Sequence, residues 1–181
     1  MKITKEPLPD IVVGIDPDCQ ESGVGVVVLC DRHVETAKMG FPLLIGYIKQ
    51  LKEIYGYNKL LVVIEGGWLN ESNWHVKAAT RYVRDVALRA AKIGRSTGMN
   101  HQTGMLIQQM CDHHGIRNKV VKPLKKCWKG KDGKITQAEL EAYTVHSKLP
   151  RTNQDQRDAI LLAWVTAGLP LRVKAKDVNQ G

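Results

Sequence analysis

Four acidic side chains occupy positions where an α/β protein builds its sites. Asp16 ends one apolar, β-branched run of the sequence, and Glu65 ends another. Asp155 and Asp158 are three residues apart at the predicted start of the last helix, so both lie on one helix face. Sites in open α/β sheets form outside the carboxyl ends of the strands. The spacing therefore predicts that these four carboxylates converge at one end of a sheet.

The chemistry that suits such a cluster is metal-assisted phosphodiester hydrolysis. Neighbouring carboxylates repel one another unless a counter-charge lies between them. Mg²⁺ is a hard cation that prefers oxygen ligands and leaves coordination sites for water and phosphate. Two such ions about 4 Å apart clamp a phosphate, one activating water and the other stabilising the leaving oxygen. We therefore predict a two-ion Mg²⁺ site, in which Mn²⁺ can substitute, with the ligands Asp16 (bridging), Glu65, Asp155 and Asp158.

Each carboxylate also has an ordinary structural interpretation. An Asp before Pro17 is often a turn former, Glu65 could be a solvated loop residue, and Asp155 suits the first turn of a helix. The combination of all four favours the metal interpretation. A nucleophilic serine or cysteine is not required, and the sequence contains no G-x-S-x-G motif.

Composition and charge narrow the class of protein. The chain has 181 residues, with 27 Lys and Arg against 18 Asp and Glu, for a net charge of +9. This favours polyanionic partners, nucleic acid first and anionic membrane second. We expect one domain over 1–171 and a polar, flexible tail over 172–181. No signal-peptide core, membrane-spanning stretch or C-x-x-C pair is present, so we expect a cytoplasmic protein with free thiols and no small-molecule cofactor.

Hydrophobic periodicity predicts the elements that must position the carboxylates. Three strands form an antiparallel meander, and later strands follow helical crossovers. The strands are predicted at 11–15, 22–30, 33–39, 60–64 and 120–121, and the helices at 42–56, 73–93, 101–114, 136–146 and 154–167. A glycine-containing loop is predicted over 94–100, and Thr136 with Glu139 forms a predicted capping box. The fold class is α/β, a mixed five-stranded sheet with an antiparallel start and flanking helices.

Three segments in this order resemble the RuvC-type Holliday-junction resolvases: VVGIDPDCQESGVGVVVL, LVVIEGGWLN and NQDQRDAILLAW. The resemblance extends from about residue 11 to residue 167. It implies a ribonuclease H-like nuclease domain that acts as a homodimer and nicks four-way DNA junctions symmetrically. It also implies metal binding by Asp16 of the I-D-P strand end, by Glu65, and by Asp155 and Asp158 of a D-x-x-D-A motif.

The resemblance also implies residues that contact nucleic acid. Trp68, three positions after Glu65, matches an aromatic residue that stacks on a base near the junction, although a tryptophan here could equally belong to the core. Lys125 and Lys134 match lysines near the scissile phosphate. Further backbone contacts are expected from Lys122, Lys126, Lys129 and Lys131. A solvated lysine-rich loop would have the same composition.

Two positions depart from the family pattern. Asp18 stands where the family usually has Gly after I-D-P, which adds a carboxylate beside the site. Arg157 is an unusual residue inside D-x-x-D. Both put the local geometry in doubt.

Three alternatives to a junction endonuclease stay open. A RuvC-like ribonuclease that processes structured RNA shares the first-strand Asp and the late Asp. An actin-like ATPase also begins with an apolar strand, an Asp and a glycine-bearing hairpin that cradles phosphate. A non-catalytic junction-binding module would normally have lost one or more of the carboxylates, and this sequence has all four.

Overall fold

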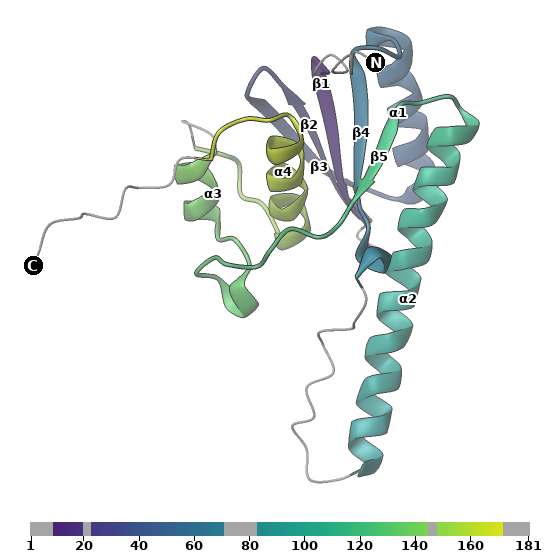
Figure 1. Ribbon diagram of the computed structural model, residues 1–181, viewed down its shortest axis with the longest axis vertical. Coiled ribbons are helices and arrows are strands. Elements are labelled where there is room, and N and C mark those ends of the chain that lie inside the picture. Colours follow the sequence, from purple (N-terminus) through teal and green to yellow (C-terminus); the bar gives the residue numbers. More distant parts are fainter. Residues whose placement is uncertain (1–8, 20–22, 71–82, 145–147, 172–181) are drawn as a thin grey trace, which may run out of the picture.

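The computed structural model describes residues 9–19, 23–70, 83–144 and 148–171. Its strands and helices follow one another as shown in Figure 1. The strands are β1 (Ile11–Asp16), β2 (Val24–Cys30), β3 (His33–Met39), β4 (Leu60–Glu65) and β5 (Asn118–Val121). The helices are α1 (Phe41–Tyr55), α2 (Val83–His113), α3 (Gln137–Tyr143) and α4 (Gln154–Thr166), with the short 3₁₀ turns η1 (Gly67–Leu69) and η2 (Lys131–Gly133).

The strands form a mixed five-stranded sheet in the order β3-β2-β1-β4-β5. The first three strands are antiparallel neighbours, whereas β4 runs parallel to β1 and β5 runs parallel to β4. The predicted α/β architecture with an antiparallel start is confirmed. Because β1 and β4 are parallel neighbours, their carboxyl ends, Asp16 and Glu65, lie at the same end of the sheet.

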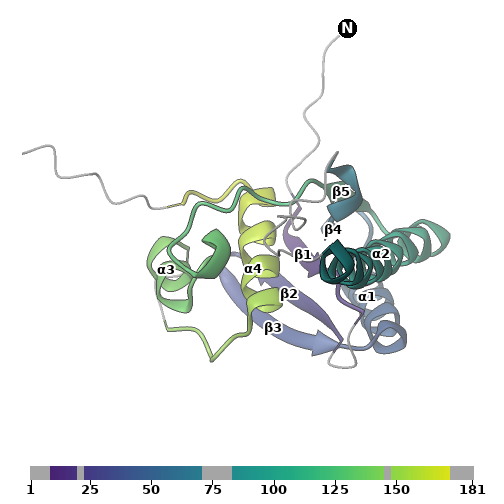
Figure 2. The same cartoon turned by 90° about the horizontal axis from the view of Figure 1, so that it is seen from below.

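Helices cover both faces of the sheet, with α1 and α2 on one side and α3 and α4 on the other (Figure 2). Alternation along β1 divides its side chains between two cores. Ile11, Val13 and Ile15 pack with α1 and α2, whereas Val12 packs with α4. Asp16 has the same parity as Val12 and therefore faces α4.

Helix α4 packs tightly on the sheet because Gly14 lacks a side chain. A Cβ atom at Gly14 would overlap the carbonyl oxygen of Ala159 and lie 2.9 Å from the Cβ atom of Ala163. Residues Ala159 to Trp164 are all buried, whereas Val165 is 40% exposed. The close fit brings the first turn of α4 over the sheet end that carries Asp16.

The main correction to the predicted elements concerns α2. The predicted loop over 94–100 lies inside one continuous 31-residue helix. Gly94 and Gly98 have helical backbones, and no atom of the described residues lies within 4 Å of a Cβ atom built at either position. Each glycine lowers helix stability by about 1 kcal/mol relative to alanine, and the helical turns on either side offset this loss. Residues 73–82 of the predicted helix, 145–147 after α3 and the tail 172–181 lie outside the described residues.

Local signals at α3 and in the cysteines are confirmed. Thr136 and Glu139 form the predicted capping box at the start of α3. The four cysteines are free thiols. Within the ranges described, no helix combines the length and apolar character needed to cross a bilayer.

Candidate metal centre

The sheet places one row of side chains under the first turn of α4. Asp16 pairs with Gly25 of β2, and Gly25 pairs with Lys38 of β3. Glu65 ends the neighbouring strand β4, two residues after Val63, which packs with α4. The row therefore runs from Lys38 across Gly25 to Asp16 and Glu65 on the face that α4 covers.

Gly25 has no side chain in this row, and Asp155 packs against its backbone from above. A Cβ atom at Gly25 would lie 2.7 Å from the carbonyl carbon and oxygen of Asp155 and 2.9 Å from its Cβ atom. Because Gly25 has no side chain, Asp155 sits directly over β2, between Asp16 and Lys38. Lys38 Nζ donates to Asp155 Oδ2 at 2.9 Å, with the two side chains 18% and 29% exposed.

The beginning of α4 is fixed by its own capping box. The side chain of Asn153 accepts from the backbone N–H of Gln156, and the side chain of Gln156 accepts from the backbone N–H of Asn153. This cap defines the first helical turn, so Asp155 lies in that turn and Asp158 lies one turn later.

Asp158 is held by a neighbouring amide, which is itself held by an arginine. Gln154 Nε2 donates to Asp158 Oδ1 at 2.8 Å, and Arg157 Nη2 donates to Gln154 Oε1 at 2.9 Å. Arg157 also donates to the carbonyl oxygens of Thr152 (2.6 Å) and Ile135 (3.1 Å). The unusual Arg157 therefore anchors the segment before α4 and orients the amide that contacts Asp158.

The electrostatics of Asp16 show that charges from three other elements converge on it. Burial raises the pKa of Asp16 well above its usual range, and the negative charges of Glu65, Asp158 and Asp155 raise the pKa further. The positive charge of Lys134 acts in the opposite direction. Asp16 is therefore expensive to ionise without a nearby cation.

Glu65 and Asp158 share this environment. Burial raises the pKa of Glu65 to about 7, with a further contribution from the charge of Asp158, while Lys126 and Lys134 oppose the shift. Burial likewise raises the pKa of Asp158, against the hydrogen bond from Gln154 and the same two lysines. Each of these carboxyl groups would be stabilised in its charged form by a cation placed among them.

The chemical type of the ligands suits a hard divalent cation, because four carboxyl groups gather at one partly buried end of the sheet. In the ranges the structure describes, however, no three acidic, histidine or cysteine side chains are arranged to hold one ion together. One oxygen of Asp155 is engaged by Lys38 and one oxygen of Asp158 by Gln154. Metal binding would therefore require these helix-borne carboxylates to exchange partners.

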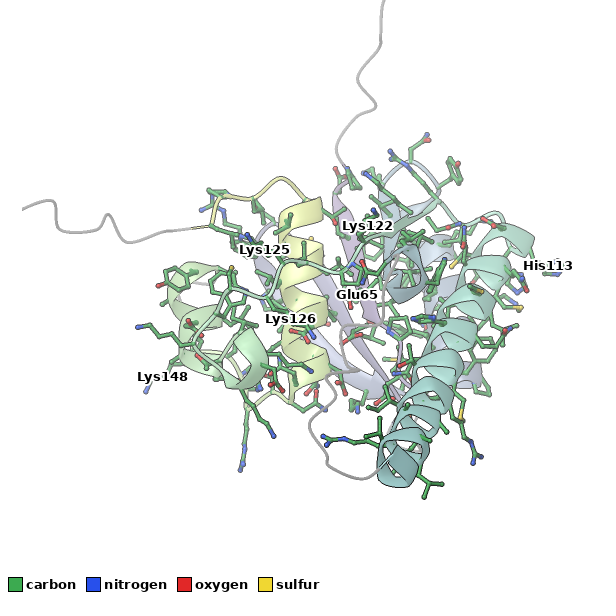
Figure 3. All side chains as sticks on the ribbon, turned by 60° about the horizontal axis from the view of Figure 1, so that its bottom comes forward. Glu65, His113, Lys122, Lys125, Lys126 and Lys148 are labelled. Carbon is green, nitrogen blue, oxygen red and sulfur yellow. The ribbon has the colours of Figure 1, made fainter. Side chains whose placement is uncertain are left out.

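The lysine segment after β5 crosses α4, and Figure 3 labels Lys122, Lys125 and Lys126 along it. Lys126 and Lys134 are the lysines whose charges lower the pKa values of Glu65 and Asp158. The predicted place of Lys134 beside the carboxylates thus has electrostatic support. Lys125 was predicted to lie there with it, but the second lysine with such support is Lys126. The side chains of the remaining predicted lysines are exposed: Lys122, Lys125, Lys129 and Lys131.

A closed turn fixes the backbone of Lys134. The backbone N–H of Gly130 donates to the carbonyl oxygen of Lys134 at 2.9 Å, and the backbone N–H of Trp128 donates to that of Gly133 at 3.0 Å. A Cβ atom at Gly130 would overlap the Lys134 carbonyl oxygen. The backbone N–H of Lys129 donates to Glu139 at 3.0 Å, which ties the turn to α3.

Trp68 packs inward from the end of β4. It is partly buried against the core under α1 and α2, and its ring lies edge-on to His101 with centroids 6.1 Å apart. A Cβ atom at Gly104 would lie 2.5 Å from Cζ3 of the indole ring and 3.0 Å from Cγ of Pro17. Trp68 therefore contributes to packing of the core, and only the exposed part of its ring could stack on a base.

Sequence reasoning missed Lys38 and Gln154. Gln154 could have been found from its i, i+4 spacing to Asp158, which places the two side chains on one helix face. Lys38 could not, because its place beside Asp155 depends on the register of β2 and β3 and on the docking of α4. The adjacent histidines His113 and His114 lie edge-on to each other, with ring centroids 4.9 Å apart.

Comparison with known proteins adds a likeness of fold. No family model matches the chain, and no curated protein sequence matches it. The structure is similar to that of Thermus thermophilus RuvC in complex with a Holliday junction substrate (14% identity, TM-score 0.48) and to another T. thermophilus RuvC structure (16% identity, TM-score 0.40). Each similarity covers 89% of this chain and 98% of the RuvC chain.

Proposed function

We propose that this chain is a Mg²⁺-dependent endonuclease that cuts branched DNA, with the four-way junction as its substrate. One observation carries the proposal. The pKa of Asp16, at the end of β1, is raised by burial and by the charges of Glu65, Asp158 and Asp155. Three carboxyl groups from two other elements, β4 and α4, therefore act on one side chain of β1, and such a cluster needs a cation for all four groups to be ionised.

In this proposal the carboxylates hold the metal and the neighbouring residues hold the carboxylates. Asp16 and Glu65 provide ligands from the rigid ends of neighbouring strands, and Asp155 and Asp158 provide ligands from α4. Bound Mg²⁺ would supply positive charge to the scissile phosphate and acidify the attacking water. Gln154 would keep Asp158 oriented, as its 2.8 Å hydrogen bond does in this structure.

The lysine segment would bind the substrate backbone. Lys126 and Lys134 are close enough to act electrostatically on Glu65 and Asp158, so their ammonium groups can neutralise a phosphate that approaches the site. The exposed Lys122, Lys125, Lys129 and Lys131 would contact phosphates farther away. The net charge of +9 supports a polyanionic substrate.

Junction specificity and the dimer belong to the same proposal. A four-way junction needs two nicks for resolution, and two copies of this chain would supply two equivalent sites. The exposed part of Trp68, three residues beyond Glu65, would stack on a base at the open centre of the junction. The support for this step is the resemblance of the three sequence segments to the RuvC-type resolvases.

The test is cleavage of three labelled substrates by the purified protein: a synthetic four-way junction, a duplex of the same sequence and a structured RNA, each with Mg²⁺ and with EDTA. We expect paired nicks in the junction with Mg²⁺ only. Cleavage of RNA with an intact junction would replace the proposal by the ribonuclease alternative. Tight junction binding without cleavage, even with Mg²⁺, would indicate a binding module, and thermal stabilisation by ATP would indicate the actin-like ATPase.

A further inference from the structure

Lys38 brings a positive charge to the carboxylates by a route separate from the lysine segment. It lies near the end of β3, the edge strand, whereas Lys126 and Lys134 follow β5 at the opposite edge of the sheet. Its register partner is Gly25, whose own partner on the other side is Asp16. The sheet thus positions the Lys38 ammonium group two strands away from Asp16, the carboxylate that ends β1.

The contact with Asp155 is short and shielded from solvent. Lys38 Nζ lies 2.9 Å from Asp155 Oδ2, and the side chains are 18% and 29% exposed. A second lysine–aspartate pair shows the contrast: Lys59 Nζ lies 3.6 Å from Asp10 Oδ2, with side chains 64% and 62% exposed. Exposed pairs such as Lys59 and Asp10 contribute little to stability, whereas the two charges of a shielded pair attract each other more strongly because the local dielectric is lower.

The backbone of Asp155 cannot move closer to the sheet to change this contact. It already packs against Gly25, where even a Cβ atom would lie 2.7 Å from the Asp155 carbonyl. A partner change at Asp155 therefore does not need α4 to approach the sheet and can take place by movement of the Asp155 and Lys38 side chains. Any divalent cation that used Asp155 Oδ2 would have to displace the ammonium group.

We propose that Lys38 is a positioning residue that acts as an internal counter-cation, holding Asp155 in the metal-free protein and releasing it when a divalent cation binds. This inference rests on the proposed function, since it takes Asp155 to be a metal ligand. Lys38 then opposes metal binding in two ways: it competes for one carboxylate oxygen, and its charge repels the incoming ion.

The inference predicts an effect opposite to that of removing a ligand. Replacing Lys38 by the uncharged Met should make Mn²⁺ bind about tenfold more tightly, since a positive charge beside the ion is lost. Lys38→Arg, which keeps the charge, should bind Mn²⁺ about as the wild type does. A purely structural role for Lys38 would instead weaken metal binding when the side chain is removed.

The experiment is titration of the full chain with MnCl₂, reading free Mn²⁺ by electron paramagnetic resonance and folding by circular dichroism. The matched control is Lys59→Met, which removes the same charge and breaks an aspartate pair that is exposed rather than shielded. Lys38→Gln serves as a second variant if Lys38→Met does not fold. Because coupled sites are not additive, the Lys38 effect should shrink in an Asp155→Asn background.

The outcomes separate this inference from the proposed function. Tighter binding in Lys38→Met or Lys38→Gln, with Lys38→Arg and Lys59→Met near wild type, supports the inference. Unchanged or weaker binding in folded uncharged variants overturns it, while the proposed function stands as long as Asp16→Asn weakens Mn²⁺ binding. Equal binding by the wild type and Asp16→Asn would overturn the metal site itself.

Discussion

The two carboxylates on strands and the two on α4 differ in how they are held. Asp16 and Glu65 end neighbouring parallel strands, and burial is the largest cause of their raised pKa values. Asp155 and Asp158 have side-chain partners, Lys38 and Gln154. The strand pair is thus fixed in place by the sheet, whereas the helix pair is kept in position by side-chain contacts that can be exchanged. Burial raises the pKa of Asp158 as well, so the way the groups are held, and not burial, separates the two pairs.

This difference suggests that the two pairs have different functions within the proposed metal site. A rigid backbone at a strand end fixes where an ion must sit, and the sheet provides that rigidity. The first turn of a helix allows its side chains to change partners while its backbone stays capped. Variants of the two pairs should therefore fail in different ways, and the following predictions are arranged from the largest expected effect to the smallest.

Asp16→Asn should have the largest effect. Loss of this ligand should lower the single-turnover cleavage rate roughly a thousandfold, because several kcal/mol of charge stabilisation are lost and about 1.4 kcal/mol corresponds to tenfold. Junction affinity, measured by fluorescence anisotropy in EDTA, should stay near that of the wild type. A normal cleavage rate in this variant would remove Asp16 from the site.

Gln154→Met should weaken Mn²⁺ binding by about tenfold, since residues that orient metal ligands typically contribute 10–100-fold to affinity. Met keeps the side-chain length but cannot donate to Asp158. The exposed Gln50 of α1 offers a control, because Gln50→Met makes the same change on a helix that covers the face of the sheet opposite α4. If both glutamine variants bind Mn²⁺ like the wild type, the hydrogen bond to Asp158 has no part in metal binding.

Lys126→Ala should slow junction cleavage several-fold, whereas Lys125→Ala should change it less than about twofold. The reason is that Lys126 acts electrostatically on Glu65 and Asp158. Each exposed phosphate contact should lower the slope of log affinity against log salt by about one. The neighbouring positions form a matched pair, and a larger rate loss in Lys125→Ala would restore Lys125 as the lysine nearest the reaction.

The pH dependence of stability should show the cost of the strand pair. The pKa of Glu65 is about 7 in the folded protein and ordinarily 4.5, so the folded state binds more protons between these values. Metal-free stability should therefore fall as pH rises from about 4.5 to 7, by at most about 3 kcal/mol from this group. At about 2–4 °C per kcal/mol, Tm in EDTA should drop by several degrees.

In the proposed metal site Mg²⁺ would bind the ionised carboxylates and reverse this loss, so the difference in Tm between Mg²⁺ and EDTA should widen with pH. Glu65→Gln removes the titrating group and should lose less stability over the same range. A Tm in EDTA that is constant or rises from pH 5 to pH 8 would contradict the assigned environment of Glu65.

Much of this site could be predicted from the sequence, because its signals are local. The apolar runs that end at Asp16 and Glu65 define two strands and their carboxyl ends. The i, i+3 spacing places Asp155 and Asp158 on one face of α4. These properties depend on residues near one another in the chain.

Contacts between distant segments were decided only by the tertiary structure. The pairing of Lys38 with Asp155 spans 117 positions and depends on strand register and on the absence of a side chain at Gly25. The continuous α2 likewise contradicts a loop that its glycines predicted, because helical turns on both sides outweigh a weak local preference. Residue types and spacing determined which groups could do the chemistry, whereas strand register and the packing of α4 on the sheet decided that Asp155 meets Lys38.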